Sequence, residues 1–246
     1  SSLGEYEFSI EKIPGILDNW ELYDHSYDNR IESNLDGPIP ESIYFEMEKT
    51  GKSFLQFSLA ISYGLTGNRE RAENYMDEAI KELQGMEKMN DLTLYMRALS
   101  HFALQEYGMA IKYGEQSLKV SNYTDQDARP GTLYIIGNSY MIKGDLAKAE
   151  KYLKRSLKLH EKRGLAYEST EVRASLAGIS LFHEDLDQGK QYMKENVELA
   201  DSLVFSQTGN MNRKFMDQLI YYYDLLAMLY IIEKEYLLAS QIIEQS

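Results

Sequence analysis

The chain of 246 residues contains no cysteine, which excludes disulfide bridges, thiolate metal sites and a cysteine nucleophile. It has only 4 prolines, and none follows Pro130, so the remaining residues can form uninterrupted helices. Its most apolar run, residues 219–232, includes Asp224 and is shorter than the roughly 20 apolar residues that a membrane-spanning helix needs. These absences argue against an all-β fold, a disulfide scaffold and a membrane span.

Motifs for metal binding, nucleotide binding and catalysis are also missing. None of the four histidines, His25, His101, His160 and His183, has a second histidine at i+3 or i+4 to complete a metal pair on one helix face. No glycine-rich phosphate loop occurs, and no strand-turn-helix pattern supports a catalytic triad. We therefore expect no metal site, no cofactor and no catalytic residue.

Basic residues are scarce relative to acidic ones. The chain has 26 Lys and Arg against 39 Asp and Glu, a net charge of −13, which repels nucleic acid and anionic membrane surfaces. Residues 1–50 hold 12 acidic and 3 basic residues and so carry −9 of this charge. We expect neither a nucleic acid nor a membrane to be the partner.

The acidic segment at residues 1–50 has an apolar face with helical spacing. This spacing predicts a helix over residues 15–32, a stop at residues 36–40 and a new helix from about Glu41. The face consists of Ile16, Trp20, Tyr23, Tyr27 and Ile31. Two interpretations stay open: a cap that covers the end of the following repeats, or an acidic surface for a basic partner.

One pattern of small residues occurs five times in the rest of the chain. In its clearest copy, Gly137 is followed by Ala149 after twelve residues and by Ser156 after seven more. Fourteen of the fifteen equivalent positions are Ala, Gly or Ser, and Asn196 is the exception. Small side chains at this spacing let antiparallel helices approach closely. The other members are Ala60, Ala72, Ala79; Ala98, Ala110, Ser117; Ala177, Gly189; Ala227, Ala239 and Ser246.

This pattern resembles the tetratricopeptide repeat (TPR). The third copy fits best, with Leu133, Ile136, Gly137, Tyr140, Ala149, Leu153 and Ser156 at the family's positions. The distances between the first small residues are 38, 39, 40 and 50, longer than the family's period of about 34. Longer repeats of this kind are similar to those of bacterial signalling and sensor proteins.

The second copy leaves two registers open. Arg97 and His101 fall where the family has apolar residues. A turn shorter by one residue would instead place Ala98, Leu99 and Phe102 at those positions.

The resemblance implies an all-α fold, a right-handed TPR-like superhelix of about five helix pairs behind an N-terminal helical cap. We expect the cap at residues 1–50 and the array at 51–246, with its last repeat truncated. The predicted repeats are residues 53–90, 91–129, 130–168, 169–212 and 213–246.

The resemblance also implies a concave groove lined by the first helix of each pair. From it we predict that a partner contacts Phe57, Tyr95, Tyr134, Asn138, Met141, Phe182, Tyr221 and Asp224. The same register places Gly178 in the groove. The lining is aromatic and apolar and lacks the Lys, Asn and Arg set with which TPR carboxylate clamps hold a peptide C-terminus.

These features predict a non-catalytic module that binds a protein or peptide segment and forms the sensory or scaffolding part of a larger signalling protein. The alternative is a structural domain that self-associates or docks onto its own chain without a separate ligand. Cytoplasmic and periplasmic locations are both compatible with this sequence.

Overall fold

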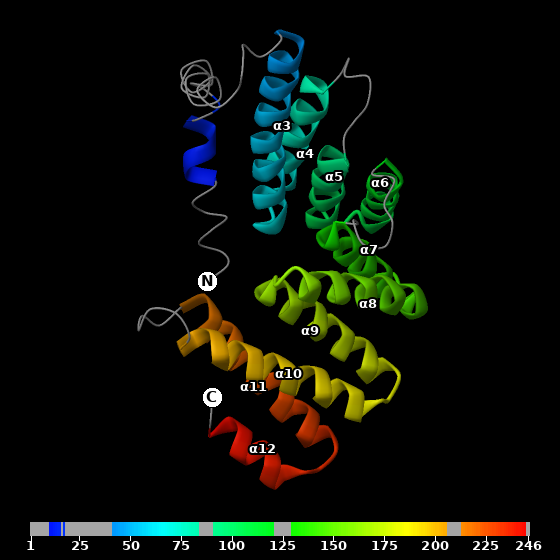
Figure 1. The fold of residues 1–246 in the computed structure, drawn as a ribbon, viewed down its shortest axis with the longest axis vertical. Coiled ribbons are helices and arrows are strands. Elements are labelled where there is room, and N and C mark those ends of the chain that lie inside the picture. The colour runs from blue at the N-terminus through cyan, green and yellow to red at the C-terminus, as the bar shows by residue number, and fades with distance from the viewer. Residues whose placement is uncertain are drawn as a thin grey trace. The chain divides into compact units, whose positions relative to one another are not determined.

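A computed structural model of the chain describes residues 10–15, 17, 41–83, 91–120, 129–205 and 213–244. The described residues form helices and turns without a strand, so the predicted all-α fold is confirmed (Figure 1). The helices are α3 (Glu41–Leu65), α4 (Arg69–Glu82), α5 (Asp91–Ala103), α6 (Tyr107–Val120), α7 (Pro130–Ile142), α8 (Leu146–Lys162), α9 (Ala166–Phe182), α10 (Leu186–Phe205), α11 (Arg213–Ile232) and α12 (Tyr236–Ile243).

The helices pack as consecutive pairs in two compact units. The first unit, Ser2–Tyr123, contains the pairs α3–α4 and α5–α6, and α3 also packs directly against α5. The second unit, Thr124–Ser246, contains α7–α8, α9–α10 and α11–α12, joined by contacts of α8 with α9 and of α10 with α11.

The N-terminal region differs in detail from the prediction. Residues 10–15 and 17 are helical, so the first helix begins before residue 15, and most of the predicted helix over 15–32 lies outside the described residues. Ile10, Ile13 and Leu17 pack against the core formed by α3 and α4. A helix begins at Glu41, as predicted, and it crosses the expected boundary between residues 50 and 51 without a break.

The turn between the two helices of a pair has the same form in all five pairs. One residue with positive φ is followed by the residue that precedes the second helix. The positive-φ residues are Gly67, Gln105, Gly144, Glu184 and Lys234, with φ between 58° and 84°. Glycine adopts this conformation most easily, yet the turn forms at three other residues. At Asp145 the side chain then accepts a hydrogen bond from the Lys148 amide at 3.2 Å and caps α8.

The small residues lie where helices meet. Every described member of the set is buried, from Ala60 in α3 to Ala239 in α12. At Gly137 an added Cβ would lie 2.7 Å from Leu153 Cγ of α8, so no larger residue fits without a shift. The spacing read from the sequence therefore marks the contacts within the helix pairs.

Polar residues at the third small position form a repeated hydrogen bond. Ser117 Oγ donates to the Asp91 carbonyl at 2.9 Å, and Ser156 Oγ donates to the Pro130 carbonyl at 2.8 Å. Asn196, the exception in the sequence pattern, donates from Nδ2 to the Thr170 carbonyl at 2.8 Å. In each case the bond links the second helix to the start of the first, 26 residues earlier.

Stacked rings resolve the open register of the second repeat. Tyr63 stacks on Tyr75 with ring centroids 5.7 Å apart, and Tyr140 stacks on Tyr152 at 5.8 Å. His101 stacks in the same way on Tyr113, twelve residues later, at 5.2 Å. His101 thus occupies the tyrosine position of the repeat, and the shifted register is wrong.

The contact at Gly137 predicts an unusual effect of adding one methyl group. Gly137→Ala should lower the free energy of unfolding by about 1–3 kcal/mol, because the new Cβ overlaps the buried side chain of Leu153. A glycine to alanine change inside an exposed helix normally stabilises by up to about 1 kcal/mol. Urea unfolding of parent and variant measures the difference. Equal stability would show that α7 and α8 do not meet at this position.

Buried histidines predict a dependence of stability on pH. Burial lowers the pKa of His101, against the opposing effect of Glu106, whose carboxylate lies 2.7 Å from Nδ1. Burial also lowers the pKa of His160, whose Nδ1 lies 3.0 Å from the Ser156 carbonyl. The folded state therefore favours the neutral rings, while the unfolded chain takes up protons as the pH falls below about 6.5.

Stability should thus be fully present above about pH 6.5 and fall below it, by at most about 1.4 kcal/mol per pH unit for each histidine. Thermal melts between pH 5 and 8 measure this decline. His160→Gln should flatten the curve, whereas His183→Gln, at an exposed position, should leave it parallel to the parent. A His160→Gln curve parallel to the parent would contradict the assignment.

Candidate functional site

An open cleft of about 370 Å³ lies in the second unit. Its walls come from α7, α9 and α11, the first helices of three successive pairs. The lining residues are Tyr134, Met141, Glu171, Ala174, Ser175, Gly178, Tyr221 and Tyr222. The cleft has the size of a site for one or two side chains, at the lower end of the roughly 300–1,000 Å³ of small-molecule pockets.

A fixed tyrosine forms the inner part of the cleft. Tyr222 is 2% exposed, and its hydroxyl donates a hydrogen bond to Thr170 Oγ1 at 2.7 Å. Burial raises the pKa of Tyr222, so its hydroxyl keeps its proton. Thr170 in turn receives the Asn196 hydrogen bond at its carbonyl, so the cleft is anchored to the contact between α9 and α10.

Asn138 is a buried residue of α7 that links α7 to α9 by hydrogen bonds. Its Nδ2 donates to the Tyr134 carbonyl at 3.1 Å, and its Oδ1 accepts from Ser175 Oγ of α9 at 3.0 Å. It is buried and is not among the residues that line the cleft. Its role is to hold α7 against α9.

Tyr134 is more enclosed than a free groove residue would be. Burial raises the pKa of Tyr134, and the nearby Glu171 carboxylate raises it further. Hydrogen bonding with the side chains of Ser175 and Asn138 acts in the opposite direction and lowers the pKa of Tyr134. Removing this side chain would therefore disturb the contact between α7 and α9 as well as the cleft.

The mouth of the cleft is formed by more accessible residues. Tyr221 is 53% exposed, with its ring centroid 5.7 Å from that of Tyr222. Met141 is half-buried on the opposite helix, and Gly178 presents no side chain on α9. Glu171 supplies the charge among the lining residues, and that charge is negative.

The structure divides the predicted groove residues. Tyr134, Met141 and Tyr221 come together in the cleft. Phe182, 73% exposed, and Asp224, also exposed, belong to the same unit but do not line it.

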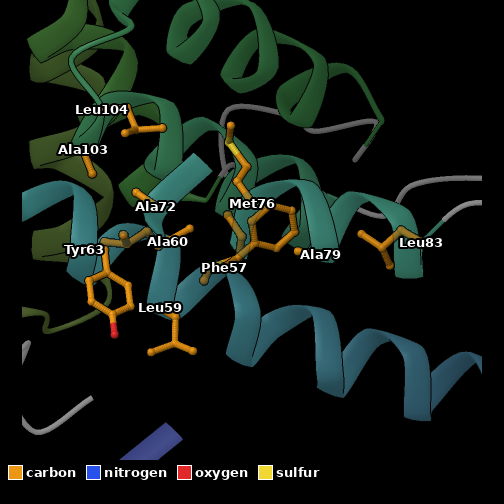
Figure 2. Close-up of a cluster of buried hydrophobic side chains, with 12 residues drawn as sticks. Phe57, Leu59, Ala60, Tyr63, Ala72, Met76, Ala79, Leu83, Ala103 and Leu104 are labelled. Atoms are coloured by element: carbon orange, nitrogen blue, oxygen red, sulfur yellow. The ribbon is translucent and has the colours of Figure 1, made fainter. Parts of the chain in front are cut away.

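Two predicted groove residues belong to the first unit. Phe57 is fully buried against Met76 and Ala79 of α4, as Figure 2 shows, so its prediction as a groove residue is wrong. The reason is that its side chain belongs to the core that α3 shares with α4. Tyr95 is half-buried and packs against the same core.

Four lining residues were not predicted as site residues: Glu171, Ala174, Ser175 and Tyr222. Glu171, Ser175 and Gly178 follow one another at intervals of four and three residues, so they share one face of α9. Gly178, which the repeat register places in the groove, is also among the lining residues. Glu171 and Ser175 lie on the same face of α9 as Gly178, closer to the start of the helix. Extending the predicted groove from Gly178 toward the start of α9 would have identified them from the sequence.

Two larger hollows, of about 490 and 620 Å³, lie in the first unit where residues 10–17 meet α3 and α4. Several polar groups in their walls already bond one another. Lys52 pairs with Glu82 at 2.7 Å, and Arg71 donates to the Tyr63 hydroxyl at 3.2 Å. The cleft in the second unit is the better candidate because the ring of Tyr221 is accessible at its mouth.

Within the ranges that the structure describes, no group of three or more His, Cys, Asp or Glu residues is arranged to hold a metal ion. Over the same ranges, every helix is too short or too polar to cross a membrane.

Comparison with known proteins identifies the repeat. Residues 130–163, which cover α7 and α8, match the family model of the tetratricopeptide repeat. No curated protein matches the sequence significantly. The chain resembles BtubC from P. vanneervenii with a TM-score of 0.69 and 14% identity, over 98% of this chain and 89% of that protein.

Two further structures share the arrangement. The apo form of RapI gives a TM-score of 0.63 at 15% identity, over 98% of this chain and 62% of RapI. The TPR-like repeats of a Podosopora anserina protein assigned as a kinesin light chain give a TM-score of 0.60 at 14% identity, over 78% of this chain and 93% of that chain. At these identities the likeness concerns the fold.

The anchored position of Tyr222 predicts a difference between two adjacent tyrosines. Tyr222→Phe should lower the free energy of unfolding by about 1–2 kcal/mol, because the buried Thr170 hydroxyl loses its hydrogen-bond donor. Tyr221→Phe, at the exposed neighbour, should change it by less than about 0.5 kcal/mol. Chemical denaturation of both variants tests this; equal effects would mean that Tyr222 is not fixed.

Proposed function

Because the chain is a TPR-like repeat protein, a fold used for protein–protein interaction and scaffolding, we propose that it is a non-catalytic module that binds a protein or peptide segment in the cleft of α7, α9 and α11. The observation that carries the proposal is the convergence of three tyrosines from two helices on one open cleft. The accessible ring of Tyr221 provides a large contact area at small cost in side-chain entropy.

The construction of the cleft supports this role. Tyr222 and Asn138 are fixed by buried hydrogen bonds before any ligand arrives, so little ordering is needed on binding. Tyr221 and Met141 are accessible at the mouth and can adapt to a bound side chain. A rigid inner wall and an adaptable mouth suit an extended segment that inserts one side chain.

In this proposal the chain is the sensory or scaffolding part of a larger signalling protein. Its cleft offers contact surface and one carboxylate, which serve recognition. Any response to the bound segment would then be produced by the parts of the protein joined to this module.

The proposal predicts unequal effects of two exposed aromatic residues. Random nonapeptides displayed on their encoding RNA are selected on the immobilised chain, and the enriched peptides are synthesised for fluorescence anisotropy. Tyr221→Ala should weaken their binding by about 1–3 kcal/mol, because a large aromatic ring at the mouth is lost. The free energy of unfolding should change little, since the ring is largely exposed.

Phe182→Ala is the matched control. Phe182 is an exposed aromatic residue of the same unit that lies outside the cleft lining, so its removal should leave peptide affinity unchanged. Enriched peptides that bind both variants as tightly as the parent would show that the cleft is not the binding site.

The alternative function is self-association without a separate ligand, and a measurement of the molecular mass in solution distinguishes it from peptide binding. Large apolar residues are exposed on the last helix pair, including Ile232, Leu237 and Ile243, at 50%, 75% and 53%. Sedimentation equilibrium of a chain that acts only as a self-associating domain would give a dimer or larger species. Selection on such a chain would also enrich no peptide.

A further inference from the structure

Most polar side chains that line the cleft are already engaged within the chain. The Tyr222 hydroxyl donates to a threonine of α9, and Ser175 Oγ donates to Asn138 at 3.0 Å. Tyr134 is hydrogen-bonded with the side chains of Ser175 and Asn138, and Glu171 also interacts with another group of the chain. A polar ligand group buried against them would have to break one of these interactions, and a buried group left without a partner is costly.

The surface that remains open to a ligand is mainly apolar. It consists of Met141 of α7, Ala174 and Gly178 of α9, and Tyr221 of α11, all of which line the cleft. Tyr221 is 53% exposed, and the other three residues are half-buried. Ala174 and Gly178 are four residues apart, so they share one face of α9. The cleft therefore combines two small residues of α9 with longer side chains from α7 and α11.

Gly178 leaves an open space in this surface. Among the described residues, no atom lies within 4 Å of the position that a Cβ at Gly178 would take. At Gly137 the same position is filled from within the chain, because Leu153 Cγ lies 2.7 Å from it. The chain thus covers one of these helix glycines with a leucine and leaves the other open.

The charge at the cleft disfavours an acidic ligand residue. Glu171 is the lining residue that carries a charge, and its carboxylate raises the pKa of Tyr134 and of Tyr222. This negative field repels a carboxylate brought by a partner. Because Glu171 already interacts with another group of the chain, an uncharged side chain is the best fit.

We infer that the cleft binds a leucine-sized aliphatic side chain of the partner segment, which lies over Gly178 and against Met141 and Tyr221. The inference rests on the proposed function and adds the chemical class of the bound residue. A branched aliphatic side chain fits because it fills the space over a helix glycine, as Leu153 does at Gly137, and needs no hydrogen-bond partner. The flexible thioether of Met141 can adjust to its shape.

The first arm of the test changes the peptide and leaves the protein intact. The nonapeptides enriched on the parent chain should share a leucine, isoleucine or methionine. Replacing that residue with alanine should weaken binding about 10-fold, because apolar contact area is lost. Asparagine, which has nearly the shape of leucine, should weaken binding at least as much, because its amide is buried without a partner. Glutamate should weaken binding most.

The second arm fills the space at Gly178. Gly178→Ala should raise the melting temperature and weaken binding of the leucine peptide about 10-fold, because the new methyl group occupies the place of the leucine. The alanine version of the peptide should lose much less affinity. The preference for leucine over alanine should therefore fall from about 10-fold to less than about 3-fold, which is the signature of a direct contact.

Gly108→Ala is the matched control. A Cβ at Gly108 also meets no described atom within 4 Å, but Gly108 belongs to the first unit and does not line the cleft. This variant should leave both the affinity and the preference for leucine unchanged. An equal loss of affinity in the two glycine variants would overturn the position of the ligand at Gly178.

The outcomes separate this inference from the proposed function. Peptides that lose affinity in Tyr221→Ala but carry a basic, acidic or polar residue at the sensitive position would overturn the aliphatic ligand and leave the binding cleft intact. A preference for leucine that is unchanged in Gly178→Ala would do the same. Peptides that bind Tyr221→Ala as tightly as the parent would overturn both, and so would a selection that enriches no peptide.

Discussion

The close approach of helices at small residues is the constraint on which the remaining structure depends. Where Gly137 meets Leu153, the backbone of α7 lies so near α8 that one additional carbon atom does not fit. The equivalent position of each other pair holds an alanine that is completely or almost completely buried, such as Ala60 and Ala98. Once two helices are fixed at this distance, the residues one turn away meet at fixed separations too. The stacks of Tyr63 on Tyr75 and Tyr140 on Tyr152 follow from this geometry.

Polar groups at these contacts connect the fold to the cleft. A serine or asparagine at the third small position has a buried donor group, which needs an acceptor, and a carbonyl in the N-terminal part of the preceding helix provides it. In the pair α9–α10 this acceptor is the Thr170 carbonyl, while the Thr170 hydroxyl accepts from Tyr222. One residue therefore joins the contact within a pair to the inner wall of the cleft, so the position of Tyr222 is set by packing rather than by a ligand.

The sequence alone predicts the helix pairs and their contacts because these depend on residue size at fixed spacing. The sequence predicts the site less well, because the repeat register selects the same positions as groove residues in the first helix of every pair. In the structure the cleft crosses the helices obliquely: it uses Tyr134 and Met141 around Gly137 in α7, but residues well before Ala227 in α11. Phe57 and Tyr134 occupy equivalent positions three residues before a small residue, yet Phe57 is completely buried while Tyr134 lines the cleft. The packing of each helix against its particular neighbours decides these differences, and the spacing of small residues does not encode it.

Gly137 and Gly178 show how the same residue serves opposite purposes in neighbouring repeats. In a sequence both are glycines inside a helix, and both are explained equally well by close packing. The structure separates them, because a side chain at Gly137 would collide with α8 and one at Gly178 would enter open space. A glycine that packing requires contributes to stability, whereas one that packing does not require lowers it through helix propensity. At Gly178 the fold therefore gives up stability at a point in the wall of the cleft where an added Cβ would meet no other atom within 4 Å.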